Sequence, residues 1–409
     1  RTARSRPSMC VADGRAAFFT RPAFLGLLSA AAVPLAAGAS GVEAAAADER
    51  VVAVALPEPR GALSRGNAAA AQLARQSPLV QATYARVEGL AGSIGDRALR
   101  DAVLFLLRGG RPVYPSRHLT PAARTEVRDA LARAGIVAAD APLSGIFPPD
   151  TEPEATTVPQ PFWAAPGSSE GSHHAYPGGL AVHESFNASL ATAFAASYDA
   201  HYFGGRATVS RDTAIAAALY HDVMKTVVFG WKFDGTLLDE LTIAGTGGHH
   251  VLSGAEAIAG GRDPRFVTTL LSAHAAPSLG DEAKVVAWCR AAAIVAGVDP
   301  VDYGLVRRAG TDYVLAADPA PLEAFVNHLS DHDYVLSVHA AHAVAPRLQE
   351  RWKRIPALAE LAPSLAWYRA AVLSRTTAIA LYDTLARNGP AAFDTAVLRI
   401  EALLQPLRV

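Results

Sequence analysis

The sequence contains very little cysteine. Cys10 and Cys289 are the only two cysteines among 409 residues, and Cys10 lies in a segment that we expect to be removed. A chain with so few cysteines has no disulfide framework, whatever compartment it occupies. Its stability must come from a packed core, and 51% hydrophobic residues suffice for one large domain or two ordinary ones.

The sequence also lacks an excess of charge of either sign. Its net charge is -1, and it has no long run of lysine and arginine. It therefore lacks the clustered positive charge that is typical of a protein that binds nucleic acid stably. A small nucleotide substrate stays compatible with this composition, because a metal site supplies its own positive charge.

The chain lacks the ~20 consecutive apolar residues of a membrane-spanning helix. The nearest run, residues 23–37, follows several arginines and is interrupted by Gly26 and Pro34. Small residues come next, with Ala-Gly-Ala at 37–39. This order is typical of a secretory signal peptide. We expect residues 1–39 to be a signal peptide and the protein to be exported, to a bacterial periplasm or the medium. An uncleaved membrane anchor and a disordered Ala-rich tail are the alternatives.

Alternation of Val, Ile and Tyr with polar residues is scarce, whereas alanine is abundant and Gly and Pro stand at segment edges. This pattern predicts an all-α protein. Residues 97–108 have the spacing of a buried amphipathic helix. Thr120 and Pro121 predict the start of another, since Thr caps a first turn and Pro suits its first position.

Six regions follow from this pattern. A Pro-rich connection at 141–170 is long and irregular, and it either lines the entrance to a site or simply links two domains. We divide the chain into a signal peptide 1–39, a linker 40–58, an N-terminal helical region 59–140, the Pro-rich connection 141–170, a metal-binding domain 171–305 and a C-terminal helical extension 306–409.

Histidine and aspartate recur in successive segments of the metal-binding region. His221 and Asp222 are adjacent and stand just before Lys225. Imidazole and carboxylate are the ligands that bind borderline divalent metals such as iron, manganese and zinc. A carboxylate beside a histidine can also bridge two ions. The other candidate metal ligands in this order are His183, His250, His274 and Asp299.

This ordered set resembles the HD-domain superfamily of metal-dependent phosphohydrolases, over residues 170–305. The string His-His-Ala-Tyr-Pro-Gly-Gly-Leu at 173–180 looks like the branch that contains HD-domain 3′–5′ exoribonucleases. The resemblance implies an HD-domain helical bundle, here with an additional N-terminal helical region and C-terminal helices. The chain departs from the family after His274, where Ala275 and Ala276 replace the common His-Glu.

The resemblance also implies how the ligands are shared. His183, His221, Asp222 and Asp299 would hold one divalent transition metal. His250 and His274 would hold a second, with Asp222 bridging. Iron or manganese is favoured, and zinc, nickel or cobalt also fits. The third segment fits the family pattern with His250, rather than His249, as the ligand.

Three other side chains are candidates for the chemistry. Lys225 lies one helical turn from the His-Asp pair and can contact a substrate oxyanion, unless it is a solvated helix lysine. His173 and His174 either contact the substrate or protonate the leaving group, or they are loop surface residues. We assign catalytic roles to Lys225, Asp222 and His174.

A second histidine set lies in the C-terminal extension, on a helix predicted from Ala320 to about Ala345. Spacings of 4, 7 and 3 residues place these histidines on one helical face. The face is solvated or at the edge of the core, covers the active site, or forms an independent metal site. Its members are His328, His332, His339 and His342.

The leading functional hypothesis is hydrolysis of a small phosphoester or nucleotide by a binuclear metal site. Two alternatives remain open. The same ligand order occurs in myo-inositol oxygenase-like proteins, which use two irons to activate oxygen. A non-catalytic metal-binding domain would also keep these ligands. The sequence leaves the oligomeric state undetermined.

Overall fold

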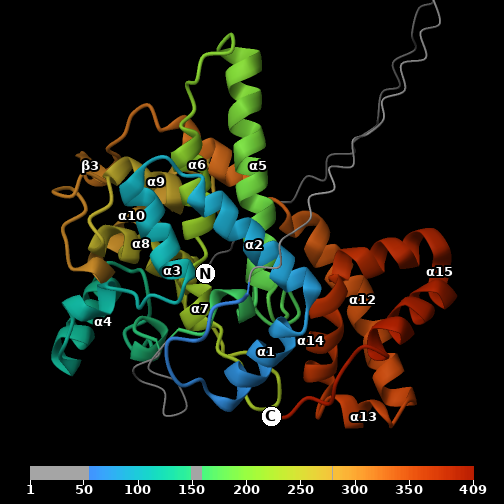
Figure 1. Ribbon diagram of the computed structural model, residues 1–409. Coiled ribbons are helices and arrows are strands. Elements are labelled where there is room, and N and C mark those ends of the chain that lie inside the picture. The colour runs from blue at the N-terminus through green and yellow to red at the C-terminus, as the bar shows by residue number, and fades with distance from the viewer. Residues whose placement is uncertain (1–54, 149–158, 279) are drawn as a thin grey trace, which may run out of the picture. The chain divides into compact units, whose positions relative to one another are not determined.

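The computed structural model describes residues 55–148, 159–278 and 280–409 (Figure 1). It confirms the expected all-α fold, since the only sheets in these residues are two antiparallel pairs of short strands. The expected signal peptide and most of the linker lie outside the described residues. Within them, no helix is both long and apolar enough to cross a membrane.

The N-terminal region forms the helices α1 (Arg65–Arg75), α2 (Pro78–Gly92), α3 (Arg97–Leu107) and α4 (Pro121–Arg133). The predicted cap of α4 is present: the hydroxyl of Thr120 accepts a hydrogen bond of 3.1 Å from the backbone N–H of Ala123. The predicted amphipathic helix at 97–108 is α3. A short 3-10 helix, η1 (Tyr114–Arg117), leads from α3 to α4, and two others are η2 (Leu143–Gly145) and η3 (Phe162–Ala164).

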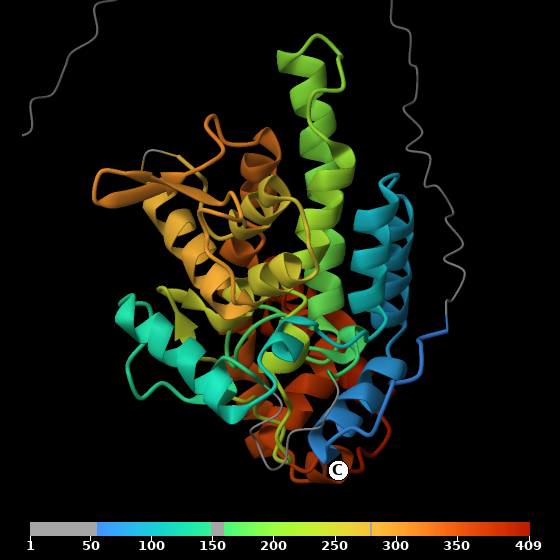
Figure 2. The same cartoon turned by 90° about the vertical axis from the view of Figure 1, so that its left-hand side faces the viewer.

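Seven helices form the central bundle. Both Figures 1 and 2 show α5 beside α2, and α5 also packs on α6 and α11, while α8 packs on α9 and α10. The last seven residues of α6, 214–220, are all buried, and four of them are alanine, which allows neighbouring helices to approach closely. The bounds are α5 (Gly179–Tyr202), α6 (Arg211–Tyr220), α7 (Lys225–Val228), α8 (Gly248–Ala259), α9 (Pro264–Leu271), α10 (Glu282–Ala296) and α11 (Leu322–Ser330).

The C-terminal helices are α12 (Tyr334–Arg354), α13 (Leu358–Leu361), α14 (Leu365–Thr376) and α15 (Ala378–Glu401). They share a second core with α1, in which the rings of Trp231 and Trp367 stack 5.6 Å apart. The strands are β1 (Thr242–Ile243), β2 (Thr246–Gly247), β3 (Val306–Ala309) and β4 (Asp312–Leu315), paired β1 with β2 and β3 with β4.

The single helix predicted from Ala320 to about Ala345 is wrong. The chain leaves the helix after Ser330, where α11 ends, and starts α12 at Tyr334. Between them the carboxylate of Asp331 turns inward, and the Asp331 side chain is only 8% exposed. Contacts with histidines of other helices therefore outweigh the helical preference of this segment.

Candidate metal centre

Ends of five helices bring histidine and aspartate side chains to one place. His183 lies in the first turns of α5, and His221 ends α6, followed directly by Asp222. His249 lies in the first turn of α8. His274 follows α9 and Asp331 follows α11. Overlapping sets of three of these residues offer donor atoms that lie within 4.8 Å of one another.

Asp222 is shared by two of these sets. Its Oδ1 lies 3.2 Å from Nε2 of His249 and 3.5 Å from Nε2 of His221. Its Oδ2 lies 3.4 Å from Nε2 of His183. Oδ1 of Asp222 and the Nε2 atoms of His221 and His249 are buried and have no hydrogen-bond partner, whereas Oδ2 of Asp222 pairs with the ammonium group of Lys225. Buried polar atoms are rarely left unpaired, so this donor set fits metal ions.

Asp331 supplies the second carboxylate. Its Oδ1 lies 3.1 Å from Nε2 of His183 and 3.4 Å from Nε2 of His221. Its Oδ2 lies 3.8 Å from Nε2 of His274. The side-chain amide of Asn187 donates a hydrogen bond of 3.0 Å to Oδ1 and fixes this carboxylate.

Three of the histidines are oriented through their Nδ1 atoms. His221 donates to the carbonyl of Ala218 at 2.8 Å, which requires the proton to be on Nδ1. Nδ1 of His249 lies 2.5 Å from the carboxylate of Glu240. Nδ1 of His274 lies 3.0 Å from the hydroxyl of Thr246. Such partners orient the Nε2 edge of each ring toward the centre. The last two partners come from the β1–β2 hairpin and the residues before it.

The aspartates of the centre are ionised. Burial works against the charge of Asp222, but His221, Lys225 and His249 hold the pKa of its carboxyl well below the usual range. The same balance holds the pKa of Asp331 well below its usual range, through its contacts with His221 and His183. Metal ligation requires carboxylates in this form.

Glu184 differs from these aspartates. It is buried, its carboxyl oxygens have no hydrogen-bond partner, and Oε1 lies 3.6 Å from Nδ1 of His221. Burial raises the pKa of Glu184 to about 8. It lies behind His221, on the Nδ1 edge of the ring.

Lys225 begins α7 and is buried, with an exposed fraction of 3%. Its ammonium group forms an ion pair with Asp222 and donates to the carbonyl of Gly167 at 2.5 Å. Gly167 lies near the end of the Pro-rich connection predicted at 141–170, so that stretch contacts the centre. A cavity of about 260 Å³ lies beside the centre, and it is lined by His173, His183, Lys225, Ala273, His274, His328, Asp331, His332 and Tyr334.

The structure does not direct His250, one of the predicted ligands, at the centre. His250 donates from Nε2 to the carbonyl of Leu271 at 3.0 Å, and its ring stacks on that of His274 with centroids 4.0 Å apart. His249 is directed at Asp222 instead. Consecutive helical residues point about 100° apart, so only one of the two histidines can face the centre. His250 holds the ring of its neighbour His274.

The structure does not bring Asp299, another predicted ligand, to the centre. Its Oδ1 accepts hydrogen bonds from the backbone N–H groups of Val301 at 2.7 Å and Asp302 at 3.1 Å. Asp299 is exposed in a turn after α10, where this bonding is common for aspartate. It is absent from the ligand sets found among the described residues, and Asp331 provides the carboxylate.

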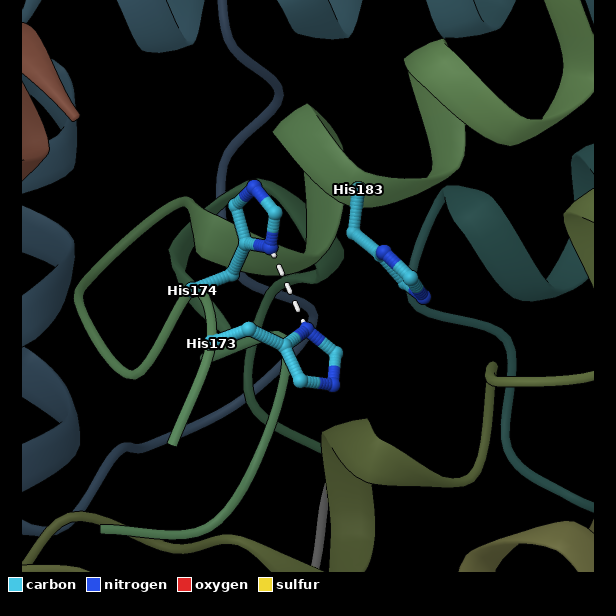
Figure 3. Close-up of side chains that lie close together, drawn as sticks. All are labelled: His173, His174 and His183. Atoms are coloured by element: carbon cyan, nitrogen blue, oxygen red, sulfur yellow. Dashed lines mark hydrogen bonds between the residues drawn. The ribbon is translucent and has the colours of Figure 1, made fainter. Parts of the chain in front are cut away.

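His174 does not line the cavity at the centre, although His173 does. Its Nδ1 lies 3.2 Å from Nδ1 of His173, and its Nε2 lies 3.5 Å from Oδ2 of Asp333 (Figure 3). The loop that carries both histidines turns His174 inward, behind His173. The predicted catalytic role of His174 in direct contact with substrate is therefore not supported by its position.

The histidine face predicted in the C-terminal extension is divided between two helices. His328 on α11 and His332 after it line the cavity, with their Nδ1 atoms bonded to the carbonyls of Ala273 and His328. The ring of His339 on α12 instead packs 5.2 Å from that of Tyr382. Part of the predicted face therefore borders the centre.

Comparisons with models of protein families, with curated proteins and with solved structures found no match to this chain. The site is therefore described by its own geometry. That geometry is a buried cluster of four imidazoles and two carboxylates which could hold metal ions: His183, His221, Asp222, His249, His274 and Asp331.

Proposed function

We propose that the protein is a metal-dependent phosphohydrolase of the HD-domain kind, which acts on a small phosphoester or nucleotide. The observation that carries this proposal is the position of the donor set. Asp222 and Asp331 each lie among several imidazoles. Asp331 lines a cavity of about 260 Å³ together with Lys225, whose ammonium group pairs with the buried Asp222.

The donor set suits two borderline divalent ions, with iron or manganese favoured. Asp222 lies between two groups, one with His183 and His221 and one with His249 and His274. When bound, two ions in such a set lower the pKa of water and neutralise charge on phosphoryl oxygens.

The chain's own groups would prepare the cavity for an anionic substrate. The ammonium of Lys225 is held by Asp222 and by the carbonyl of Gly167, so its position is fixed before a substrate arrives. Fixed charges in a site with little water stabilise developing negative charge more than mobile ones do. His328 and His332 also line the cavity. Their Nδ1 atoms donate to backbone carbonyls, so Nε2 is the nitrogen that each ring has left for a substrate.

The size of the cavity favours a compact substrate. Sites for small molecules commonly have volumes of about 300 to 1,000 Å³, and this cavity of about 260 Å³ is near the lower limit. Together with a net charge of -1, this size supports a small phosphoester or a single nucleotide rather than a long nucleic-acid strand.

The test uses the full chain, purified and loaded with Mn²⁺ or Fe²⁺, and measures phosphate release from a panel of phosphomonoesters, phosphodiesters and nucleotides. We expect turnover in wild type and a loss of both metal and turnover in Asp331→Asn. Asp299→Asn is the matched control, since that carboxylate lies in an exposed turn and should leave both properties near the wild-type level.

Repeating the assay without oxygen separates hydrolysis from oxygenation. Hydrolysis consumes water alone and continues under argon, whereas an oxygenase stops. A metal-loaded wild type that releases no phosphate from any member of the panel would contradict the proposal. Equal metal content in the two variants would show that the centre is assigned wrongly.

A further inference from the structure

Beyond the proposed centre, the geometry points to an auxiliary site for a borderline divalent metal ion, held by His173, His174 and His183. This site is distinct from the centre that binds substrate in the proposed function, and it shares only His183 with it. Each of the three residues offers a ring nitrogen, and these nitrogens lie within 4.8 Å of one another.

The three rings come from two segments. His173 and His174 are neighbours in the loop before α5, and Figure 3 shows their rings side by side with the ring of His183 across from them. The ring centroid of His183 lies 5.0 Å from that of His173 and 5.5 Å from that of His174. The Asp333 side chain is 7% exposed and lies next to this group, with Oδ2 3.5 Å from Nε2 of His174.

His183 can serve both sites because its ring has two nitrogens on different edges. Its Nε2 lies 3.1 Å from Asp331 and belongs to the centre described above. Its Nδ1 is buried and has no hydrogen-bond partner, and it lies 3.8 Å from Oδ2 of Asp333. Because the same oxygen is close to His174, the Nδ1 edge faces the auxiliary group. An ion on Nδ1 would displace the ring proton, which leaves to solvent.

The backbone of His174 provides independent support. Its φ angle is +53°, in the left-handed region that only a few per cent of residues other than glycine adopt. The carbonyl of His174 accepts hydrogen bonds from the N–H groups of Gly167 at 2.9 Å and Tyr176 at 2.8 Å. Gly179 lies so close that a Cβ there would be 1.9 Å from this carbonyl oxygen. Strain held in place by its surroundings in this way occurs at functional sites.

The donor set indicates the class of ion. Imidazole suits zinc, copper, iron and nickel, and three protein ligands with an open position are typical of reactive zinc sites. His173 also lines the cavity of the main centre, so an ion at the auxiliary site would be reachable from it. We assign Zn²⁺, or an ion of the same borderline kind, to this site.

The test compares wild type with His173→Gln and His174→Asn. Asparagine tolerates the left-handed conformation, so His174→Asn removes the imidazole and keeps the backbone. Metal-free full chain is saturated with Zn²⁺, unbound ion is removed, and bound zinc is counted per chain. We expect each variant to hold about one ion fewer than wild type. When Co²⁺ replaces Zn²⁺, the visible absorption spectrum of wild type should contain one coloured species that both variants lack.

A second pair of variants separates this inference from the proposed function. His249→Gln and His274→Gln touch only the main centre and should keep the coloured species that His173→Gln loses. If both His173→Gln and His174→Asn bind as much zinc as wild type, no ion binds at the auxiliary site. His173 and His174 are then only hydrogen-bonded to each other. If the two variants each lose one ion but wild type releases no phosphate, the proposed function is wrong and the auxiliary site still stands.

Discussion

At the residue scale, Glu240 is the best test of how the centre is oriented. Its carboxylate lies 2.5 Å from Nδ1 of His249, whose Nε2 is directed at Asp222. Loss of such an outer partner commonly lowers metal affinity by ~10–100-fold. We expect Glu240→Gln to weaken binding of Mn²⁺ or Zn²⁺ by this factor, measured by competition with a chromophoric chelator.

Asp239 provides the control for that experiment. It is the preceding residue in the chain and is exposed, so Asp239→Asn changes the charge equally without touching His249. Its metal affinity should stay at the wild-type value. Equal weakening in both variants would mean that charge alone, and not the hydrogen bond to His249, accounts for the effect.

The sequence predicted those residues whose position depends on local pattern. His221 and Asp222 are adjacent at the end of a helix, so any fold that buries one places the other nearby. His250 was chosen over its neighbour by analogy, and the choice failed because the first turn of α8 turns His249 inward. Asp331 was missed because it stood inside an apparent helix, and only the string Asp-His-Asp at 331–333 marked it.

At the element scale, the loop between residues 165 and 179 has to hold the two histidines against α5. Gly179 begins α5, and a Cβ at this position would lie 1.9 Å from the carbonyl oxygen of His174. We expect Gly179→Ala to destabilise the protein by about 1–3 kcal/mol, the usual range for overpacking in a filled interior. Urea unfolding measures the change.

Gly89→Ala is the matched control for this loop. Gly89 lies within α2, and nothing would be within 4 Å of a Cβ there. Alanine in an open helical position stabilises by about 0.5–1 kcal/mol relative to glycine. The two substitutions should therefore shift the free energy of unfolding in opposite directions. A neutral Gly179→Ala would show that the loop has room to adjust.

The break between α11 and α12 shows the limit of periodicity as a guide to elements. The spacing of His328, His332 and His339 fits one helix, and the structure confirms helices on both sides of the gap. A period of 3.6 residues reports which residues share a face but not whether a helix is interrupted. Here ion pairs of Asp331 with His183 and His221 favour the interruption, and those partners are about 110 to 148 residues away in sequence.

At the scale of the whole molecule, Glu256 links the N-terminal helices to the central bundle. It lies on α8 and accepts hydrogen bonds from the N–H groups of Val113 at 2.6 Å and Tyr114 at 2.9 Å. Burial raises the pKa of Glu256 to about 7 from its usual 4.5. A raised folded-state pKa means that the stabilisation is complete below pH 4.5 and is lost as the pH rises through 7.

We therefore expect Glu256→Gln to behave differently on the two sides of this window. As the pH rises from 5 to 8, the free energy of unfolding of the variant should increase relative to that of wild type. The increase should be up to about 3 kcal/mol, at 1.36 kcal/mol per pKa unit. Urea unfolding at both pH values measures the difference. Glu126 on α4, largely exposed, serves as the control position, and Glu126→Gln should show no such change.

The all-α character of the molecule was predictable because alanine abundance and helix caps are local properties. How the helix ends meet was not predictable, since it depends on packing between segments far apart in sequence. That meeting leaves Asp222 and Asp331 ionised among buried donor atoms that have no hydrogen-bond partners. A buried cluster of this kind contributes little to stability until its charges and lone pairs are matched.

Metal removal should therefore lower the stability of the whole molecule. An ion that binds the folded state alone contributes about 2.7 kcal/mol when its free concentration is 100 times Kd. We expect the melting temperature of the full chain to fall on dialysis against a chelator and to recover when Mn²⁺ or Zn²⁺ is returned. Asp222→Asn should melt at the same temperature in both conditions, because it lacks the shared carboxylate. If the melting temperature of wild type does not change when metal is removed or returned, these side chains form a polar core rather than a metal centre.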